Sequence, residues 1–154
     1  MKSKGFITSF TVAQSPEEVM KAIQNVRGWW SENIHGRTDE CGAEFEFQSK
    51  GFHRSTQRIT ELVPEKRVVW QVTDSHLSFV EDEAEWTGTE IVFEIARQGD
   101  RTELRFTHVG LVPAIECYGD CSGAWGFYVN ESLRGLIATG KGQPETKALA
   151  AGGA

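Results

Sequence analysis

The stretch that most constrains the fold lies near the C-terminal end, at residues 123–140. Its sequence, GAWGFYVNESLRGLIATG, predicts one long helix. At about 100° per residue, the apolar side chains gather on about a third of the helix circumference. They are Trp125, Val129, Leu133, Leu136 and Ile137, with Tyr128 at the edge of the stripe. Phe127 faces away from the stripe, and polar residues take the opposite side. The helix therefore needs one broad apolar surface to cover it.

Residues 42–110 can supply that surface as a sheet. Apolar and polar residues alternate there, with a period of two that is typical of half-buried strands. The five expected strands begin at Gly42 and continue over residues 52–63, 67–73, 89–97 and 102–109. Because most connections between them are short, the strands are expected to pair antiparallel as hairpins. The fold class is therefore predicted to be α+β, with a curved antiparallel sheet wrapped around a long C-terminal helix.

The N-terminal segment adds a strand and a helix. Residues 5–13 alternate in the same way as the later strands. Ser15, Pro16 and Glu18 then provide a capping residue, a proline at the first helical position and a Glu three residues after the cap. A helix is expected to begin there. Residues 29–34, which start with two adjacent tryptophans, are expected to form a short second helix.

Length and composition narrow the class of protein. A chain of 154 residues suits one domain, expected at residues 1–140, followed by a flexible tail at 141–154. A net charge of −6 argues against nucleic acid or an anionic membrane as the main partner. The sequence shows neither a signal-peptide pattern nor an apolar run long enough to span a membrane. The three cysteines are expected to be reduced thiols. Together these features favour a cytoplasmic protein without a membrane span.

A set of short motifs adds a resemblance to a known family. The motifs are Ser15-Pro16-Glu17-Glu18-Val19, Ile59-x-Glu61-x-x-Pro64 before Val68-Val69-Trp70, Gly88-Thr89-x-Ile91-x-Phe93, Thr107-His108-x-Gly110, and Trp125-Gly126 at the head of the last helix. In this order they resemble the START-like (SRPBCC) superfamily, and within it the branch similar to the activator of heat-shock-protein-90 ATPase. The resemblance covers about residues 5–140. It implies the helix-grip fold and, in many relatives, a deep cavity that binds an apolar molecule.

The aromatic residues that are expected to line such a cavity come from the inward faces of the strands and the helix. They are Phe45, Phe47, Trp70, Phe93, Phe106 and Trp125, covered by Trp30, Phe79 and Trp86. Ligand pockets are mostly apolar with a few placed polar groups, so this set suits a hydrophobic ligand. The same residues would also make an ordinary filled core, and the sequence leaves both interpretations open.

Polar residues of the presumed inward face are the other candidates. Glu61, His108 and Tyr128 are predicted to contact a ligand, with Asp74 on the same face. A buried carboxylate beside an imidazole could move a proton, although such residues more often serve as hydrogen-bonded structural groups. Cys117 and Cys121 lie four apart, but the four-ligand set that zinc favours is missing. No metal, cofactor or catalytic residue is therefore expected.

Three functions stay open at this level, because relatives of this fold differ in function. The favoured one is binding of an apolar small molecule or lipid-like metabolite in the cavity. The first alternative is a chaperone-activator-like interaction protein, with a stress-related role, that acts through its surface. The second is a cofactor-free enzyme on a polyketide-like or aromatic substrate. A binding module predicts a large void, whereas an interaction protein predicts a filled core and an exposed apolar patch. Either a monomer or a homodimer is expected.

Overall fold

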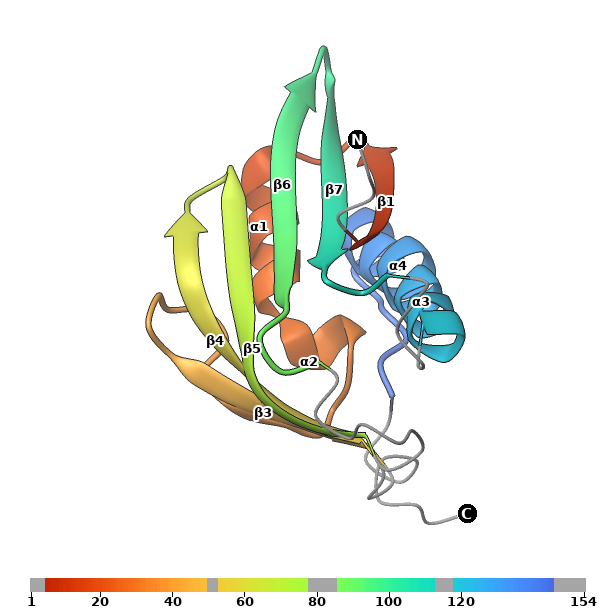
Figure 1. Cartoon of the computed structure of the whole chain (residues 1–154). Helices are drawn as coiled ribbons and strands as arrows, with labels where there is room; N and C mark the ends of the chain where they lie inside the picture. Colours follow the sequence, from red (N-terminus) through yellow and green to blue (C-terminus); the bar gives the residue numbers. More distant parts are fainter. Residues whose placement is uncertain (1–4, 50–52, 78–85, 113–117, 146–154) are drawn as a thin grey trace.

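A computed structural model describes residues 5–49, 53–77, 86–112 and 118–145 (Figure 1). Its seven strands form one sheet in the order β1-β7-β6-β5-β4-β3-β2, and each neighbouring pair is antiparallel. The strands are β1 (Gly5–Val12), β2 (Ile34–Gly36), β3 (Glu44–Ser49), β4 (His53–Val63), β5 (Arg67–Leu77), β6 (Glu90–Gln98) and β7 (Arg101–Val109). The sheet curves around the helices in Figure 1. The predicted α+β helix-grip architecture is confirmed.

The first helix begins where the sequence predicts. Helix α1 (Pro16–Gln24) has Ser15 as its N-cap, and the Ser15 Oγ accepts a hydrogen bond from the Glu18 backbone N–H. The Glu18 carboxylate accepts one in return from the Ser15 backbone N–H, at 3.0 Å. This reciprocal capping satisfies two backbone donors that the first turn of a helix otherwise leaves unpaired. The buried face consists of Val19, Met20, Ala22 and Ile23.

The second helix differs from the prediction. Helix α2 covers Val26–Trp29 instead of the predicted residues 29–34, and residues 34–36 form the edge strand β2. The chain turns at Trp30, and Arg27 then fixes the following residues by donating to the carbonyls of Ile34 and Gly36, at 2.9 and 2.8 Å. A helix over residues 29–34 would keep Trp29 and Trp30 on different faces. The turn instead buries both tryptophans in the same interior.

The C-terminal helix runs from Tyr118 to Thr139 in three segments: α3 (Tyr118–Phe127), the π-helix η1 (Tyr128–Leu133) and α4 (Arg134–Thr139). The predicted stripe is confirmed, because Trp125, Val129, Leu133 and Ile137 are all buried. Side chains four apart drift by about 40° per step around a regular α-helix. A π-helical segment takes in extra residues per turn, so it corrects this drift and keeps the four residues on one side.

The first residues after that helix contact the body of the domain. The Glu145 backbone accepts from the Glu32 N–H and donates to the Trp30 carbonyl, at 2.8 and 3.0 Å. The Gln143 N–H donates to the Ser132 hydroxyl at 2.6 Å, which in turn donates to the Trp29 carbonyl. Residues 141–145 are thus held against α2 and η1. The boundary at residue 140 and the tail beyond it stay predictions.

Candidate functional site

The interior between sheet and helix is built around Trp29, the last residue of α2. This side chain is fully buried, and its Nε1 donates to the Ile23 carbonyl at 3.1 Å. Its ring centroid lies 5.9 Å from that of Phe93 and 6.4 Å from those of three other tryptophans, which are Trp30, Trp70 and Trp125. Trp29 therefore occupies the centre of the space that the strands and the C-terminal helix enclose.

The aromatic residues predicted to line a cavity surround Trp29 and contact one another. Each is at most 5% exposed, namely Trp30, Phe45, Phe47, Trp70, Trp86, Phe93, Phe106 and Trp125. Trp30 stacks on Phe47 with centroids 4.3 Å apart. Phe106 and Trp125 come from opposite sides, sheet and helix, and their centroids are 4.8 Å apart. In the described part of the interior these side chains form one packed cluster. Phe79 lies outside the described residues.

Sequence reasoning missed the central residue of this cluster. Trp29 and Trp30 are adjacent, and neighbouring side chains on one helix point in different directions. That argument assumed a continuing helix, so only Trp30 was taken as an inward residue. In the structure α2 ends at Trp29, and this allows both rings to turn inward.

His108 belongs to a buried hydrogen-bonded chain at the head of the C-terminal helix. Its Nδ1 accepts from Trp125 Nε1 at 3.0 Å, and its Nε2 lies 2.8 Å from Thr89 Oγ1. Thr89 Oγ1 donates to the Trp86 carbonyl at 2.6 Å. Because an indole N–H can only donate, Nδ1 is unprotonated and Nε2 carries the proton. Both ring nitrogens thus hold structural partners, an arrangement that suits support of the fold more than proton transfer.

Two of the predicted inward carboxylates lie outside the interior. Glu61 is exposed and pairs with Arg67, with Oε1 and Nε 3.1 Å apart, so its predicted inward position is wrong. The pairing of β4 with β5 shifts register between Ile59 and Glu61 and again between Thr56 and Gln57. A shift by one residue moves the following side chains to the other face. For the same reason Asp74 is exposed. A ligand contact for Glu61 stays a prediction.

Tyr128 lies half-buried at the start of η1, at the edge of the apolar stripe as predicted. Burial raises the pKa of its phenol above the usual 10.0, and the nearby negative charge of Glu145 raises it further. Its ring also contacts Phe127 edge-to-face at 5.1 Å. Tyr128 thus borders the interior rather than lining its centre.

A small polar area interrupts the apolar interior on β4 and β5. Gln57 is fully buried, and its Nε2 donates to Ser55 Oγ at 2.5 Å. The Gln57 Oε1 and the Trp70 Nε1 are both buried and have no hydrogen-bond partner among the described residues. The Ser75 hydroxyl, also buried, lies 2.9 Å from that of Thr87. One buried acceptor, on β4, and one buried donor, on β5, are therefore left for a ligand or a water molecule. Gln57 shares the inward parity of Ile59, a signal the sequence prediction did not use.

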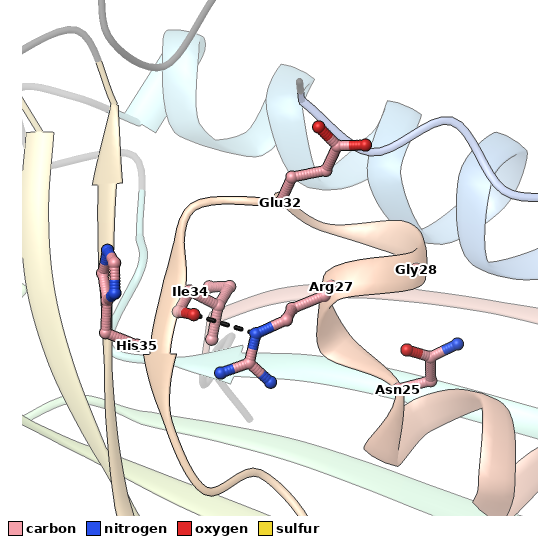
Figure 2. Close-up of a pocket in the computed structure, with 6 residues that line it drawn as sticks. All are labelled: Asn25, Arg27, Gly28, Glu32, Ile34 and His35. Atoms are coloured by element: carbon pink, nitrogen blue, oxygen red, sulfur yellow. Dashed lines mark hydrogen bonds between the residues drawn. The ribbon is translucent and has the colours of Figure 1, made fainter. Parts of the chain in front are cut away.

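A surface groove of about 580 Å³ lies beside α2 and β2 (Figure 2). It is lined by Asn25, Arg27, Gly28, Glu32, Ile34 and His35. In Figure 2 the Arg27 side chain reaches toward the Ile34 carbonyl, while Glu32 and His35 point in other directions. The lining side chains do not converge on one point. Beside the groove, Arg27 holds β2 against α2 through its hydrogen bonds to the Ile34 and Gly36 carbonyls.

Other kinds of site find no support within the described ranges. No three His, Cys, Asp or Glu side chains there lie close enough together to hold a metal ion. No described helix has the length and apolar character needed to cross a membrane. The Cys41 side chain is exposed and the Cys121 side chain is buried. Cys117 lies outside the described residues.

Comparison with known proteins agrees with this architecture. The chain is similar to the Aha1 dimer from Colwellia psychrerythraea, whose solution structure shares 26% identity at a TM-score of 0.72, over 89% of this chain and 98% of that one. It shares the fold of protein SSP2350 from Staphylococcus saprophyticus, with 12% identity and a TM-score of 0.67 over 92% and 97% of the two chains. CalU16 from Micromonospora echinospora has the same fold, with 15% identity and a TM-score of 0.60 over 86% of this chain and 74% of that one.

Among curated proteins none matches the chain. The sequence profile described as activator of Hsp90 ATPase homolog 1-like protein matches residues 14–138, which is most of the chain. Both the profile and the fold place the chain in the Aha1-like branch of the START-like proteins. The chain therefore belongs to the family of activator of Hsp90 ATPase homolog 1-like proteins.

Proposed function

We propose that this chain is an interaction protein that acts through its outer surface on an Hsp90-type chaperone. The observation that carries the proposal is the position of Trp29, whose ring fills the centre of the interior. A carrier of a large apolar molecule needs a cavity of roughly 300–1,000 Å³. In the described interior that space is taken by aromatic rings in mutual contact, so a large ligand would have to displace them.

Exposed apolar side chains on the outside give the proposal a second support. Among the described residues the large ones are Ile7, Val63 and Phe127, which are 53%, 37% and 41% exposed. These side chains offer contact points for a partner, although single exposed apolar residues are ordinary on protein surfaces. The description of the family names the same kind of activity. Because the relative from Colwellia psychrerythraea is a dimer, we also propose that this chain forms a homodimer.

The proposal is tested by measuring the ATPase rate of a purified Hsp90-type chaperone while this protein is titrated into it. A saturable increase in rate is expected, and Phe127→Ser should weaken it if the exposed ring contacts the chaperone. The buried Trp125→Phe variant is the control for a change that leaves the surface intact. An unchanged ATPase rate at saturating protein, together with tight binding of a naphthalene-sulfonate dye in the interior, would overturn the proposal and favour the carrier interpretation.

A second candidate function is binding of a small uncharged molecule at the polar area of β4 and β5. It rests on the two buried atoms without partners, Gln57 Oε1 and Trp70 Nε1. A donor group of a ligand can bind the first and an acceptor group the second, and the buried residues of the described interior include no Asp, Glu, Lys or Arg. Native mass spectrometry of protein purified from its own host would detect such a ligand. A measured mass equal to that of the chain alone would exclude a bound ligand and leave water as the partner of these two atoms.

A further inference from the structure

The edge strand β1 has only part of the protection that is usual at a sheet edge, because the Arg101 guanidinium donates to its Thr11 carbonyl at 3.3 Å. Its sequence, GFITSFTV, contains no charged residue and no proline. It pairs with β7 over all eight residues without a register shift. As the last strand in the sheet order, β1 has no strand on its other side among the described residues. Natural edge strands are usually short, charged, bulged or covered, because their free backbone groups otherwise pair with another chain.

The opposite edge of the sheet is protected in this way. Strand β2 has three residues, and the Arg27 guanidinium donates to its Ile34 and Gly36 carbonyls, at 2.9 and 2.8 Å (Figure 2). Two carbonyls that point to the same side of a strand are thereby occupied. The two ends of the sheet therefore differ in length: β2 has three residues with Arg27 on two of its carbonyls, whereas β1 has eight residues with Arg101 on the Thr11 carbonyl near its end.

The C-terminal helix covers one face of β1. Thr8 Oγ1 donates to Asn130 Oδ1 at 3.2 Å, and the Arg134 guanidinium lies 5.8 Å above the Phe10 ring. On the other face Ile7 is 53% exposed. Phe127, on the helix turn before Asn130, is 41% exposed. A strand added beside β1 would thus meet the exposed Ile7 side chain on the sheet.

We propose that β1 is the homodimer interface and pairs antiparallel with β1 of a second copy across a twofold axis. The proposal rests on the homodimer proposed above and assigns its surface. An isologous contact requires a surface that fits itself, and an uncharged strand can face its own copy without repulsion in a chain of net charge −6. The twofold contact pairs the two β1 edges with each other. The paired sheet then ends on both sides at a β2 edge capped by Arg27.

The size of this contact sets the expected strength. A stable interface usually buries about 800 Å² on each partner. One pair of eight-residue strands gives less than that, so Ile7 must supply part of the apolar contact. The dimer is therefore expected to dissociate on dilution, with a dissociation constant on the order of micromolar.

The test replaces Ile7 by lysine, the residue that natural edge strands use against pairing. Sedimentation velocity over a concentration series would compare the parent, Ile7→Lys and the matched control Val63→Lys. Val63 is also an exposed aliphatic residue, but it lies at the end of β4. The dissociation constant of the dimer should rise at least about tenfold in Ile7→Lys and stay within about twofold of the parent in Val63→Lys. Circular dichroism would check that each variant folds.

Each outcome decides a different part of the proposal. A parent protein that stays monomeric up to roughly 100 μM would overturn the homodimer itself, whatever the chaperone assay shows. A dimer that Ile7→Lys leaves intact would overturn the β1 interface and leave the homodimer standing. If Ile7→Lys does not fold, hydrogen exchange of the parent decides instead. The backbone amides of β1 should exchange more slowly at high than at low protein concentration, and equal rates would reject the interface.

Discussion

Trp125 Nε1 donates a hydrogen bond to His108 Nδ1 at 3.0 Å, and this contact joins the C-terminal helix to strand β7 inside the domain. Both side chains are at most 2% exposed. On the other side of the imidazole, His108 Nε2 lies 2.8 Å from Thr89 Oγ1. The ring that the sequence offered as a proton-transfer group is thus an internal connector between helix, strand and loop.

Replacing His108 should destabilise the fold, because the Trp125 N–H then has no acceptor for its hydrogen bond. His108→Leu strands the buried Trp125 N–H without an acceptor, which typically costs about 1–3 kcal/mol of the free energy of unfolding. A urea titration of the two single variants, His108→Leu and Trp125→Phe, and of the double variant measures the coupling. A coupling of about 1 kcal/mol is expected, whereas additivity within about 0.3 kcal/mol would show that the hydrogen bond is unimportant.

Trp29→Ala should test whether the interior is filled. Deleting a fully packed tryptophan typically costs about 3–5 kcal/mol of the free energy of unfolding, because it loses burial and leaves a void. Added indole should then recover part of the loss, since a ligand that binds only the folded state stabilises it. Trp29→Phe is the control. Its free energy of unfolding should fall by less than that of the alanine variant, and added indole should raise it only slightly. If the alanine variant lost under about 1 kcal/mol, the space around Trp29 would already be open.

Arg27→Met should weaken the capped edge of the sheet. The methionine keeps much of the apolar stem but cannot donate to the Ile34 and Gly36 carbonyls. Because Arg27 is exposed, a modest loss of about 1 kcal/mol in the free energy of unfolding is expected. Light scattering at high concentration should also rise, since the β2 edge is uncovered. Arg37→Met, which breaks only a surface ion pair with Asp39 and Glu40, is the control and should change neither quantity.

The raised pKa of Tyr128 predicts that the protein loses stability in alkaline solution. Burial and Glu145 raise the pKa of its phenol above 10.0, so the folded protein keeps the proton to a higher pH than the unfolded chain does. The stability that this group contributes is therefore complete below about pH 10 and is lost as the pH rises through the raised pKa. The Tyr128→Phe variant should show a flatter fall in thermal midpoint above pH 10 than the parent. Tyr118→Phe, which keeps Tyr128, should behave as the parent does.

Local patterns determined much of this protein. The capping sequence at Ser15 fixed the start of α1, because its contacts lie within one helical turn. Period-two alternation located the five strands between residues 42 and 110, and the apolar stripe located the C-terminal helix. The identities of the aromatic interior residues followed from the same parity, which depends only on backbone geometry.

Only the tertiary structure decided what these residues do. Glu61 is exposed because the pairing of β4 with β5 shifts register between Ile59 and Glu61. The residues that neighbour Glu61 in the sequence do not determine this shift, because it arises between two strands. The turn at Trp30 places Trp29 at the centre of the interior. It depends on the hydrogen bonds of Arg27 and on those of residues 143–145, and the latter residues are far from Trp30 in the sequence. Whether aromatic residues enclose a void or fill it is a question of how side chains from distant segments meet. The alternation of a strand, which reports only the face on which a side chain lies, cannot answer it.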